Sequence, residues 1–128
     1  MPLHVRIVTP RKVAFDGETS EIRAPAFLGQ FGALPAHERF LAAVRPGRVI
    51  LTTPEGDRRF VVGSGFVEVG SDQVTLLADL CEEVGAVTPE AASAALREAE
   101  GELVSLQDGT VAWAEAERRA DLARARMG

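Results

Sequence analysis

Three things are scarce in this chain of 128 residues: cysteine, histidine and positive charge. The single cysteine, Cys81, excludes an intrachain disulfide, and the first residues lack the basic-then-apolar pattern of a signal peptide, so a cytosolic protein is expected. The net charge of −5 argues against nucleic acid as the main partner, because binding phosphates needs a basic surface. No apolar run reaches the roughly 18 residues of a membrane-spanning helix, so direct membrane insertion is not expected.

Catalytic and metal-binding motifs are scarce as well. His4 and His37 are the only histidines, and neither H-x-x-x-H nor C-x-x-C spacing occurs. Gly63-Ser64-Gly65 lacks the strand-to-helix context of a nucleophile elbow and is interpreted as a bulge or tight bend inside a hairpin. The acidic neighbours of Cys81 are expected to raise the pKa of its thiol, which predicts a structural cysteine. We therefore expect neither an enzyme nor a metal site.

The part of the chain before residue 85 carries the pattern of short strands. Leu3, Val5 and Ile7 alternate with polar residues, so they are expected to face a core while His4 and Arg6 face outward. Asp16-Gly17 predicts a tight turn between strands at 13–15 and 20–24. Further strands are predicted at 40–44, 48–53, 58–62, 65–69 and 74–78. So many short strands without an intervening helix indicate an antiparallel sandwich or barrel.

The remaining residues predict two helices. Thr88 can cap the first and Pro89 suits its first position, while Asp108-Gly109 ends it and Thr110 can cap the second. Two apolar stripes with helical spacing follow: Ala92, Leu96, Ala99, Leu103 and Leu106, then Trp113, Ala116, Ala120, Ala123 and Met127. The short connection predicts an antiparallel hairpin. Because its seam is mostly alanine, we expect the hairpin to be the less stable region and able to detach.

These patterns together predict an α+β fold. An N-terminal antiparallel β-sandwich, or flattened barrel, is expected over residues 1–85, followed by an antiparallel two-helix hairpin over residues 86–128. The residues alone indicate a binding or assembly module. Two other hypotheses stay open: a free-standing sandwich that binds a small ligand under a structural helical cap, and a hydrolase that uses His37.

The second predicted helix ends with a cluster of basic residues. Four arginines belong to this cluster: Arg118, Arg119, Arg124 and Arg126. Positive charge suits the negative end of a helix dipole, and a solvated face accounts for much of the pattern. The functional alternative is a basic helix that binds an acidic partner.

The order of segments resembles the epsilon subunit of the F-type ATP synthase, called delta in mitochondria. The segments that carry the resemblance are LHVRIVTP at 3–10, FDGE at 15–18, GALPAH at 32–37, RPG at 45–47, GSGFVEV at 63–69 and VTLLAD at 74–79. An alanine-rich helical hairpin completes the order. The resemblance covers essentially the whole chain.

The resemblance implies a non-catalytic rotor subunit of the central stalk, peripheral to the cytoplasmic face of the inner (plasma) membrane. It implies that the sandwich sits on the c-ring and packs against the gamma subunit, coupling proton-driven rotation to ATP synthesis. The hairpin would fold against the sandwich or extend into the alpha/beta catalytic head, and the extended form would restrain ATP hydrolysis. The basic residues Arg118, Arg119, Arg124 and Arg126 would then face acidic loops of the beta subunits.

The resemblance also selects candidate contact residues in the segment GQFGALPAHERFLAAVRPG at 29–47. The c-ring candidates are Gln30, Phe31, His37, Glu38 and Arg39, which makes His37 a contact or turn residue. Some family members bind ATP through an [IL]-D-x-x-R-A motif at the first helix. Here Thr88 and Ala91 occupy the Asp and Arg positions, so no cofactor is expected. The string Asp121–Ala125 fits D-x-x-R-A, but it lies in the second helix and is interpreted as a chance match.

Overall fold

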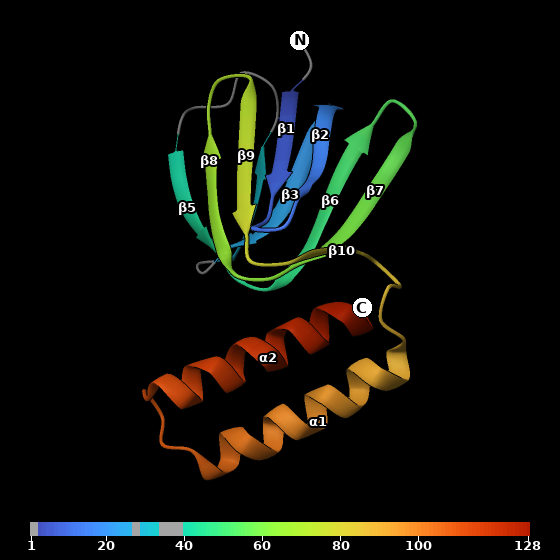
Figure 1. Cartoon of the computed structure of the whole chain (residues 1–128). Coiled ribbons are helices and arrows are strands. Elements are labelled where there is room, and N and C mark those ends of the chain that lie inside the picture. The colour runs from blue at the N-terminus through green and yellow to red at the C-terminus, as the bar shows by residue number, and fades with distance from the viewer. Residues whose placement is uncertain (1–2, 27–28, 34–39) are drawn as a thin grey trace.

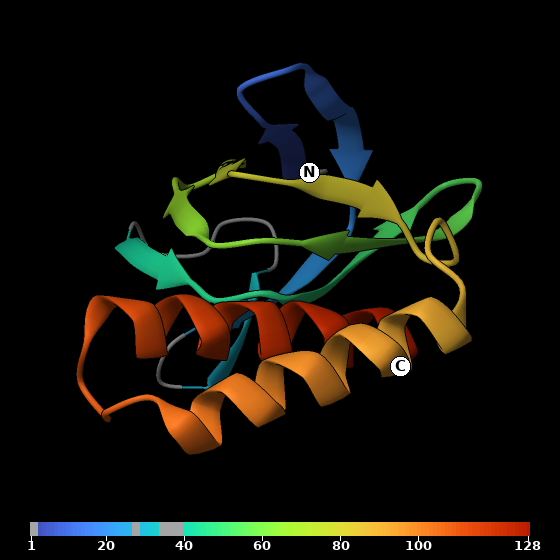
Figure 2. The ribbon, with the colours of Figure 1, turned by 60° about the horizontal axis from the view of Figure 1, so that its bottom comes forward.

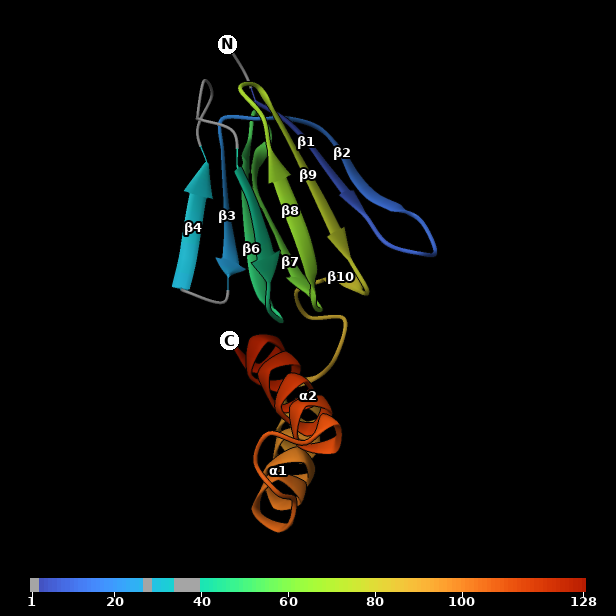
Figure 3. The same ribbon diagram turned by 90° about the vertical axis from the view of Figure 1, so that its left-hand side faces the viewer.

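The computed structural model describes residues 3–26, 29–33 and 40–128, with the backbone alone at 25–26 and 29–33. Two β-sheets are stacked face to face, and a pair of helices lies across one end of the stack (Figures 1 and 3). The predicted α+β fold, a β-sandwich followed by a helical hairpin, is confirmed. The predicted division at residues 85 and 86 stays a prediction.

Each sheet has five strands. Sheet I is ordered β2(Val13–Thr19), β1(Leu3–Val8), β9(Gln73–Ala78), β8(Gly65–Val69) and β5(Phe40–Val44). Sheet II is ordered β10(Cys81–Glu83), β7(Gly56–Val62), β6(Gly47–Thr53), β3(Glu21–Ala26) and β4(Gly29–Ala33). The strands β4 and β10 are not among the predicted ones, because a short glycine-rich or acidic segment carries little strand signal by itself.

The core lies between the two sheets and is built from alternate residues of their strands. The predicted inward set of β1 is confirmed, since Leu3, Val5 and Ile7 are fully buried. Sheet II supplies Ile22, Val49, Leu51, Phe60 and Val62 from the opposite side. Branched side chains of this kind suit a half-buried pleated sheet, and their burial supplies most of the stability of the sandwich.

The predicted turn at Asp16-Gly17 is wrong. Both residues lie inside β2, where they pair with Arg6 and Val5 of the neighbouring strand. The chain leaves β2 only at Ser20, where it passes from sheet I to β3 in sheet II. The turn that precedes β2 lies at residues 9–12, where the Thr9 hydroxyl accepts hydrogen bonds from the backbone N–H groups of Arg11 and Lys12. The side chain of Thr9 thus stabilises a turn that lacks an Asp-Gly signal, and cross-strand pairing with β1 overrides the local preference of Asp16-Gly17.

One strand pair departs from the predicted antiparallel arrangement. β1 and β9 run parallel, with Val5 opposite Val74 and Ile7 opposite Leu76. Some sixty residues separate these strands in the sequence, so the connection is long enough to return in either direction. Both strands bury one alternating face, and that pattern is the same for parallel and antiparallel neighbours.

Gly63-Ser64-Gly65 joins the two sheets, from β7 in sheet II to β8 in sheet I. The prediction of a bend is confirmed, but the bend crosses between sheets and does not lie within a hairpin. A Cβ atom on Gly65 would overlap the carbonyl oxygen of Leu77, and one on Gly63 would overlap the carboxylate of Asp79. Gly65 is required because two backbone segments approach too closely there for a side chain, whereas a side chain at position 63 would have to displace the Asp79 carboxylate.

The helices form the predicted antiparallel hairpin. α1(Pro89–Ser105) begins where Thr88 accepts a hydrogen bond from the Ala91 N–H, and α2(Val111–Met127) begins where Thr110 accepts one from the Trp113 N–H. α1 ends at Ser105, slightly before the predicted stop, and Leu106 already has extended backbone. α2 lies between the sandwich and α1 (Figures 1 and 2). No helix in the described part of the chain is long and apolar enough to cross a membrane.

Candidate partner-binding surfaces

The predicted c-ring contacts belong to a segment that the structure describes only in part. Gln30 and Phe31 lie in β4, where their backbones pair with Pro25 and Ala24. His37, Glu38 and Arg39 lie outside the described residues. β4 runs toward the end of the sandwich opposite the helices (Figure 3). The roles of these five residues therefore stay predictions.

The outer face of sheet I carries a line of apolar side chains that crosses all five strands. Cross-strand pairing aligns them, and we call them the apolar row: Ala43, Phe66, Leu77, Val8 and Val13. Phe66 is 56% exposed, Leu77 51% and Val13 49%. Single exposed apolar residues are ordinary, but a continuous line of them across a sheet is typical of a surface that another protein covers.

The next line of outward residues on sheet I is mixed in character. It consists of Leu41, Glu68, Thr75, Arg6 and Asp16. Asp16 lies between His4 and Arg6, with its Oδ1 at 2.6 Å from His4 Nε2 and its Oδ2 at 3.6 Å from Arg6 Nε. The prediction that His4 and Arg6 face outward is confirmed. The apolar row therefore has charged residues along one side, the usual arrangement of a binding surface with a polar rim.

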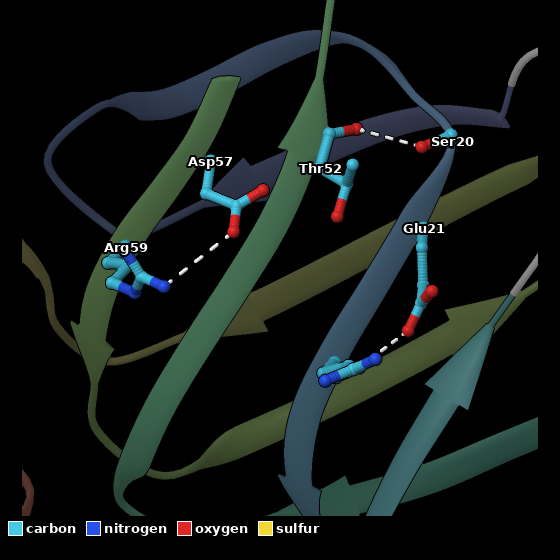
Figure 4. Close-up of polar contacts among 6 residues, drawn as sticks. Ser20, Glu21, Thr52, Asp57 and Arg59 are labelled. Atoms are coloured by element: carbon cyan, nitrogen blue, oxygen red, sulfur yellow. Dashed lines mark hydrogen bonds and ion pairs between the residues drawn. The ribbon is translucent and has the colours of Figure 1, made fainter.

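The outer face of sheet II shows a different chemistry. Asp57 and Arg59 lie 3.6 Å apart on β7, and the Ser20 hydroxyl donates to the Thr52 carbonyl at 3.4 Å (Figure 4). Glu21 accepts a hydrogen bond from Arg23 at 2.6 Å on β3. These exposed ion pairs contribute little to stability because water screens them. They identify this part of sheet II as a solvated face.

Arg119, one of the basic candidates of α2, is bonded inside the hairpin. Its two terminal nitrogens donate to the two carboxylate oxygens of Glu102 on α1, with Nη2 at 3.2 Å from Oε1. This hydrogen bond lowers the pKa of the Glu102 carboxyl and raises the pKa of Arg119. The pair joins the middle of α2 to the last turns of α1.

The other three arginines differ in their surroundings. Arg124 reaches Asp121 at 3.1 Å within α2 and Glu100 at 3.5 Å on α1. Arg126 bonds Glu82 of β10, with Nε at 2.6 Å from Oε1, and both side chains are largely buried. Arg118 has no carboxylate partner among the residues that the structure describes. Three of the four candidates thus have internal partners in this form of the molecule, so an acidic partner would have to compete for them.

The chemistry of single residues follows their burial. The Cys81 thiol faces the core, and burial raises its pKa to about 11. Lys12 opposes this shift, and Glu82 and Glu83 each add a smaller increase. The predicted direction is confirmed, although burial outweighs the acidic neighbours. No group of three His, Cys, Asp or Glu side chains suited to a metal ion occurs in the described ranges.

Sequence reasoning missed two features that the surfaces depend on. The apolar row joins residues from five strands, and only the register of the sheet brings them into line. The signal was present in Phe66 and Leu77, which occupy outward positions of strands whose inward positions are already apolar. The pairing of Arg126 with Glu82 joins residues 44 positions apart and has no local signal.

The family model and the relatives that match this chain point to the same family. Residues 2–84 match the family model "ATP synthase, Delta/Epsilon chain, beta-sandwich domain". An ATP synthase epsilon chain of Anaeromyxobacter sp. (strain K) is 38% identical over 84% of this chain and 82% of its own length. The ATP synthase epsilon chain of Nitrosococcus oceani is 36% identical over 98% of this chain and 88% of its own length.

Two solved structures share the fold. A chain of the Euglena gracilis mitochondrial ATP synthase, in a structure of its OSCP/F1/c-ring part, superposes with a TM-score of 0.83 at 17% identity and covers 96% of this chain and 78% of its own. A chain from the central stalk and c-ring of the Tetrahymena thermophila enzyme has a TM-score of 0.60 at 16% identity, over 100% of this chain and 98% of its own. At these identities the likeness establishes the fold.

Proposed function

Because the chain belongs to the delta/epsilon family of ATP synthase subunits, we propose that it is a non-catalytic rotor subunit of the central stalk. In this role it couples proton-driven rotation of the c-ring to ATP synthesis. It binds the gamma subunit and the c-ring and stays peripheral to the cytoplasmic face of the membrane. The observation that carries the proposal in this molecule is the apolar row, a line of exposed apolar side chains on sheet I of a chain of this family.

The apolar row is the surface that we assign to the gamma subunit. The chain's own hairpin lies across the end of the sandwich and leaves Phe66 and Leu77 about half exposed. Large apolar side chains at the centre of an interface carry most of its binding energy, and charged groups at the rim fix its orientation. Glu68 and Arg6 are placed to act as such a rim.

Phe66→Glu tests this assignment. Placing a charge in the middle of the apolar row should weaken the complex with the cognate gamma subunit by about 2 kcal/mol or more, close to thirtyfold in Kd. The measurement is a titration of the full-length chain against gamma, for example by calorimetry. Circular dichroism confirms that the sandwich stays folded, which is expected because Phe66 points away from the core.

Val104→Glu is the matched control. Val104 is 88% exposed near the turn of the hairpin, so the same charge replaces an exposed apolar residue outside the apolar row. The affinity for gamma should be unchanged. Equal weakening by both variants would contradict the assignment of the apolar row, and absence of any complex with wild-type protein at micromolar concentration would contradict the proposed function itself.

The c-ring contact is proposed for the end of the sandwich opposite the helices. β4 runs toward this end and carries Gln30 and Phe31, and His37, Glu38 and Arg39 follow it in the sequence. This arrangement separates three surfaces on the molecule: the ring contact at one end, the gamma contact on sheet I, and the hairpin at the other end (Figure 3).

The hairpin is proposed to restrain ATP hydrolysis when it extends into the alpha/beta head. Its internal ion pairs hold Arg119, Arg124 and Arg126, and extension would make Arg126 available to acidic loops of the beta subunits. A higher rate of ATP hydrolysis by the complete enzyme after deletion of residues 88–128 would support this role. An unchanged rate would contradict it.

We propose that the isolated chain does not bind ATP through the family motif. The Thr88 hydroxyl at the motif's Asp position caps α1, and Ala91 at its Arg position has no group that could pair with a phosphate. Asp121 and Arg124 of the second match bond each other on α2. The alternative of a free-standing ligand-binding sandwich is less favoured, because the described space between the sheets is filled by side chains.

A further inference from the structure

α2 has two faces with different neighbours. Ala116, Ala120 and Ala123 are fully buried at the spacing of one helical stripe, the stripe that the sequence assigns to the seam with α1. On the side toward the sandwich, α2 lines an open groove of about 430 Å³ with Glu115, Arg118, Arg119 and Leu122. The opposite wall of this groove is made by Pro46, Gly63, Ser64, Asp79 and Leu80. Between residues 115 and 122, α2 is therefore only loosely packed against the sandwich.

The last turn of α2 makes close polar contacts. Arg48 of β6 donates from Nε to the Ala125 carbonyl at 2.7 Å. Arg126 donates to both oxygens of Glu82, with Nη2 at 3.2 Å from Oε2. Among the described residues, the hydrogen bonds and ion pairs between helices and sandwich all involve Ala125 or Arg126. Each side of the contact therefore contributes one arginine: Arg48 comes from the sandwich and Arg126 from the helix.

The surface under this turn is a single row of sheet II. Cross-strand pairing places Arg48, Val61 and Glu82 side by side on β6, β7 and β10. They point away from the core, because the neighbouring residues Val49, Phe60 and Val62 point into it. Val61 is nevertheless only 1% exposed, and α2 contacts both β6 and β7. Because the residues on either side of Val61 bond the last turn of α2, this turn covers Val61.

The hydrogen bonds of this turn are charge-assisted and largely shielded from water. The Arg126–Glu82 pair is bidentate, and its side chains are only 20% and 18% exposed, so water screens the attraction weakly. The Ala125 carbonyl is one of the last four of the helix, which have no partner inside it, and the charge of Arg48 suits the negative end of the helix dipole. Removing one member would leave the other charge largely buried without a partner.

From these contacts we propose that residues 125–126 form a latch that holds the hairpin on the sandwich. Glu82 and Arg48 are the residues of the sandwich that bond the latch, and Val61 is the apolar residue between them that the latch covers. The groove beside residues 115–122 leaves that part of α2 with few contacts to the sandwich that would oppose release. This inference concerns contacts within the chain, so it does not depend on the proposed partners.

The test measures how often the hairpin leaves the sandwich in the full-length protein. Spin labels at Glu55, in the β6–β7 turn, and at Gln107, in the turn of the hairpin, are both exposed and report one distance in the latched form. The labels are attached to cysteines in a Cys81→Ala background. Arg126→Gln and Glu82→Gln should each raise the population with altered distances about tenfold, since a charge-assisted bond of this kind is lost. Arg48→Gln should raise it less.

Arg124→Gln is the matched control, because Arg124 lies in the same turn and bonds only within the hairpin. It should leave the distance distribution unchanged. The Glu82→Gln/Arg126→Gln double variant should release the hairpin no more than the worse single variant, because both remove the same pair. The latch is overturned if Arg124→Gln and Arg126→Gln release the hairpin equally, or if neither Glu82→Gln nor Arg126→Gln changes the distances. Amide NMR spectra of the sandwich confirm that the variants remain folded.

Discussion

The sandwich and the hairpin bury different kinds of side chain. The sandwich buries leucine, isoleucine, valine and phenylalanine from both sheets, whereas the fully buried positions of the described helices are all alanine. A buried leucine or valine contributes about 1.5–3 kcal/mol, and a methyl group about 0.8 kcal/mol. The hairpin therefore gains much less from each buried position.

This difference shows how one chain can combine a stable body with a movable part. In the sandwich, burial of large side chains makes the arrangement of strands hard to alter. In the hairpin, alanine permits close packing of α1 and α2. The Arg119–Glu102 pair joins the two helices, and the Arg126–Glu82 pair holds the hairpin on the sandwich. Ion pairs can be exchanged for a partner's groups, but a buried leucine cannot leave its core without unfolding it.

Separating the two regions should give the largest effect. A chain of residues 1–87 should keep its sandwich, while a peptide of residues 86–128 should lose more than about half of its helix, because isolated short helices with few large contacts are marginal in water. Far-UV circular dichroism of the two fragments and the intact chain measures this. A peptide that stays fully helical would contradict the comparison, and so would an unfolded sandwich fragment.

The same substitution should have opposite effects in the two regions. Gly65→Ala should destabilise the sandwich by about 1–3 kcal/mol, since the new methyl group meets the Leu77 carbonyl and the backbone must move. Gly101→Ala should stabilise the hairpin by about 0.5–1 kcal/mol, because Gly101 lies inside α1 with open space around it.

Chemical denaturation followed separately in each region distinguishes these outcomes. Fluorescence of Trp113, the only tryptophan, reports the hairpin, and the amide signals of the strands report the sandwich. If Gly65→Ala and Gly101→Ala changed the free energy of unfolding in the same direction, the expected difference between sandwich and hairpin would be wrong.

The smallest expected effect is a change in the stability of the hairpin at acidic pH. The hydrogen bond from Arg119 lowers the folded-state pKa of Glu102 below its ordinary value of 4.5. The stabilisation from this pair is therefore present above pH 4.5 and is lost as the pH falls through the lowered pKa. An NMR titration of the Glu102 side chain should show its midpoint move up in Arg119→Gln. Arg118→Gln, which changes the neighbouring arginine, should leave the midpoint where it is, and equal shifts in both variants would exclude the specific bond.

The candidate surfaces were only partly predictable. The basic cluster on α2 was visible in the sequence, but the sequence did not show that Arg126 bonds Glu82 while Arg118 stays unpaired among the described residues. The exposed positions of Phe66 and Leu77 follow from strand alternation. Their alignment with Val13 depends on a register shift between Ile7 and Val8, where β2 has one extra residue, Ala14, opposite β1.

The sequence by itself determined the local structure of this protein. Thr88 and Thr110 mark the starts of both helices, the alanine stripes mark their seam, and the alternation of Leu3, Val5 and Ile7 marks the inward face of β1. These signals act over a few residues, where side-chain spacing and backbone geometry are directly linked. The sequence order also indicated the family.

Only the tertiary structure decided which distant residues meet. It placed β1 parallel to β9, carried β2 straight through Asp16-Gly17, and brought Glu82 and Arg48 to the end of α2. Each of these choices depends on which strand or helix lies alongside, and a local pattern is equally satisfied by several neighbours. The partner is selected by the packing of the whole core, because only one arrangement buries all of its large side chains at once.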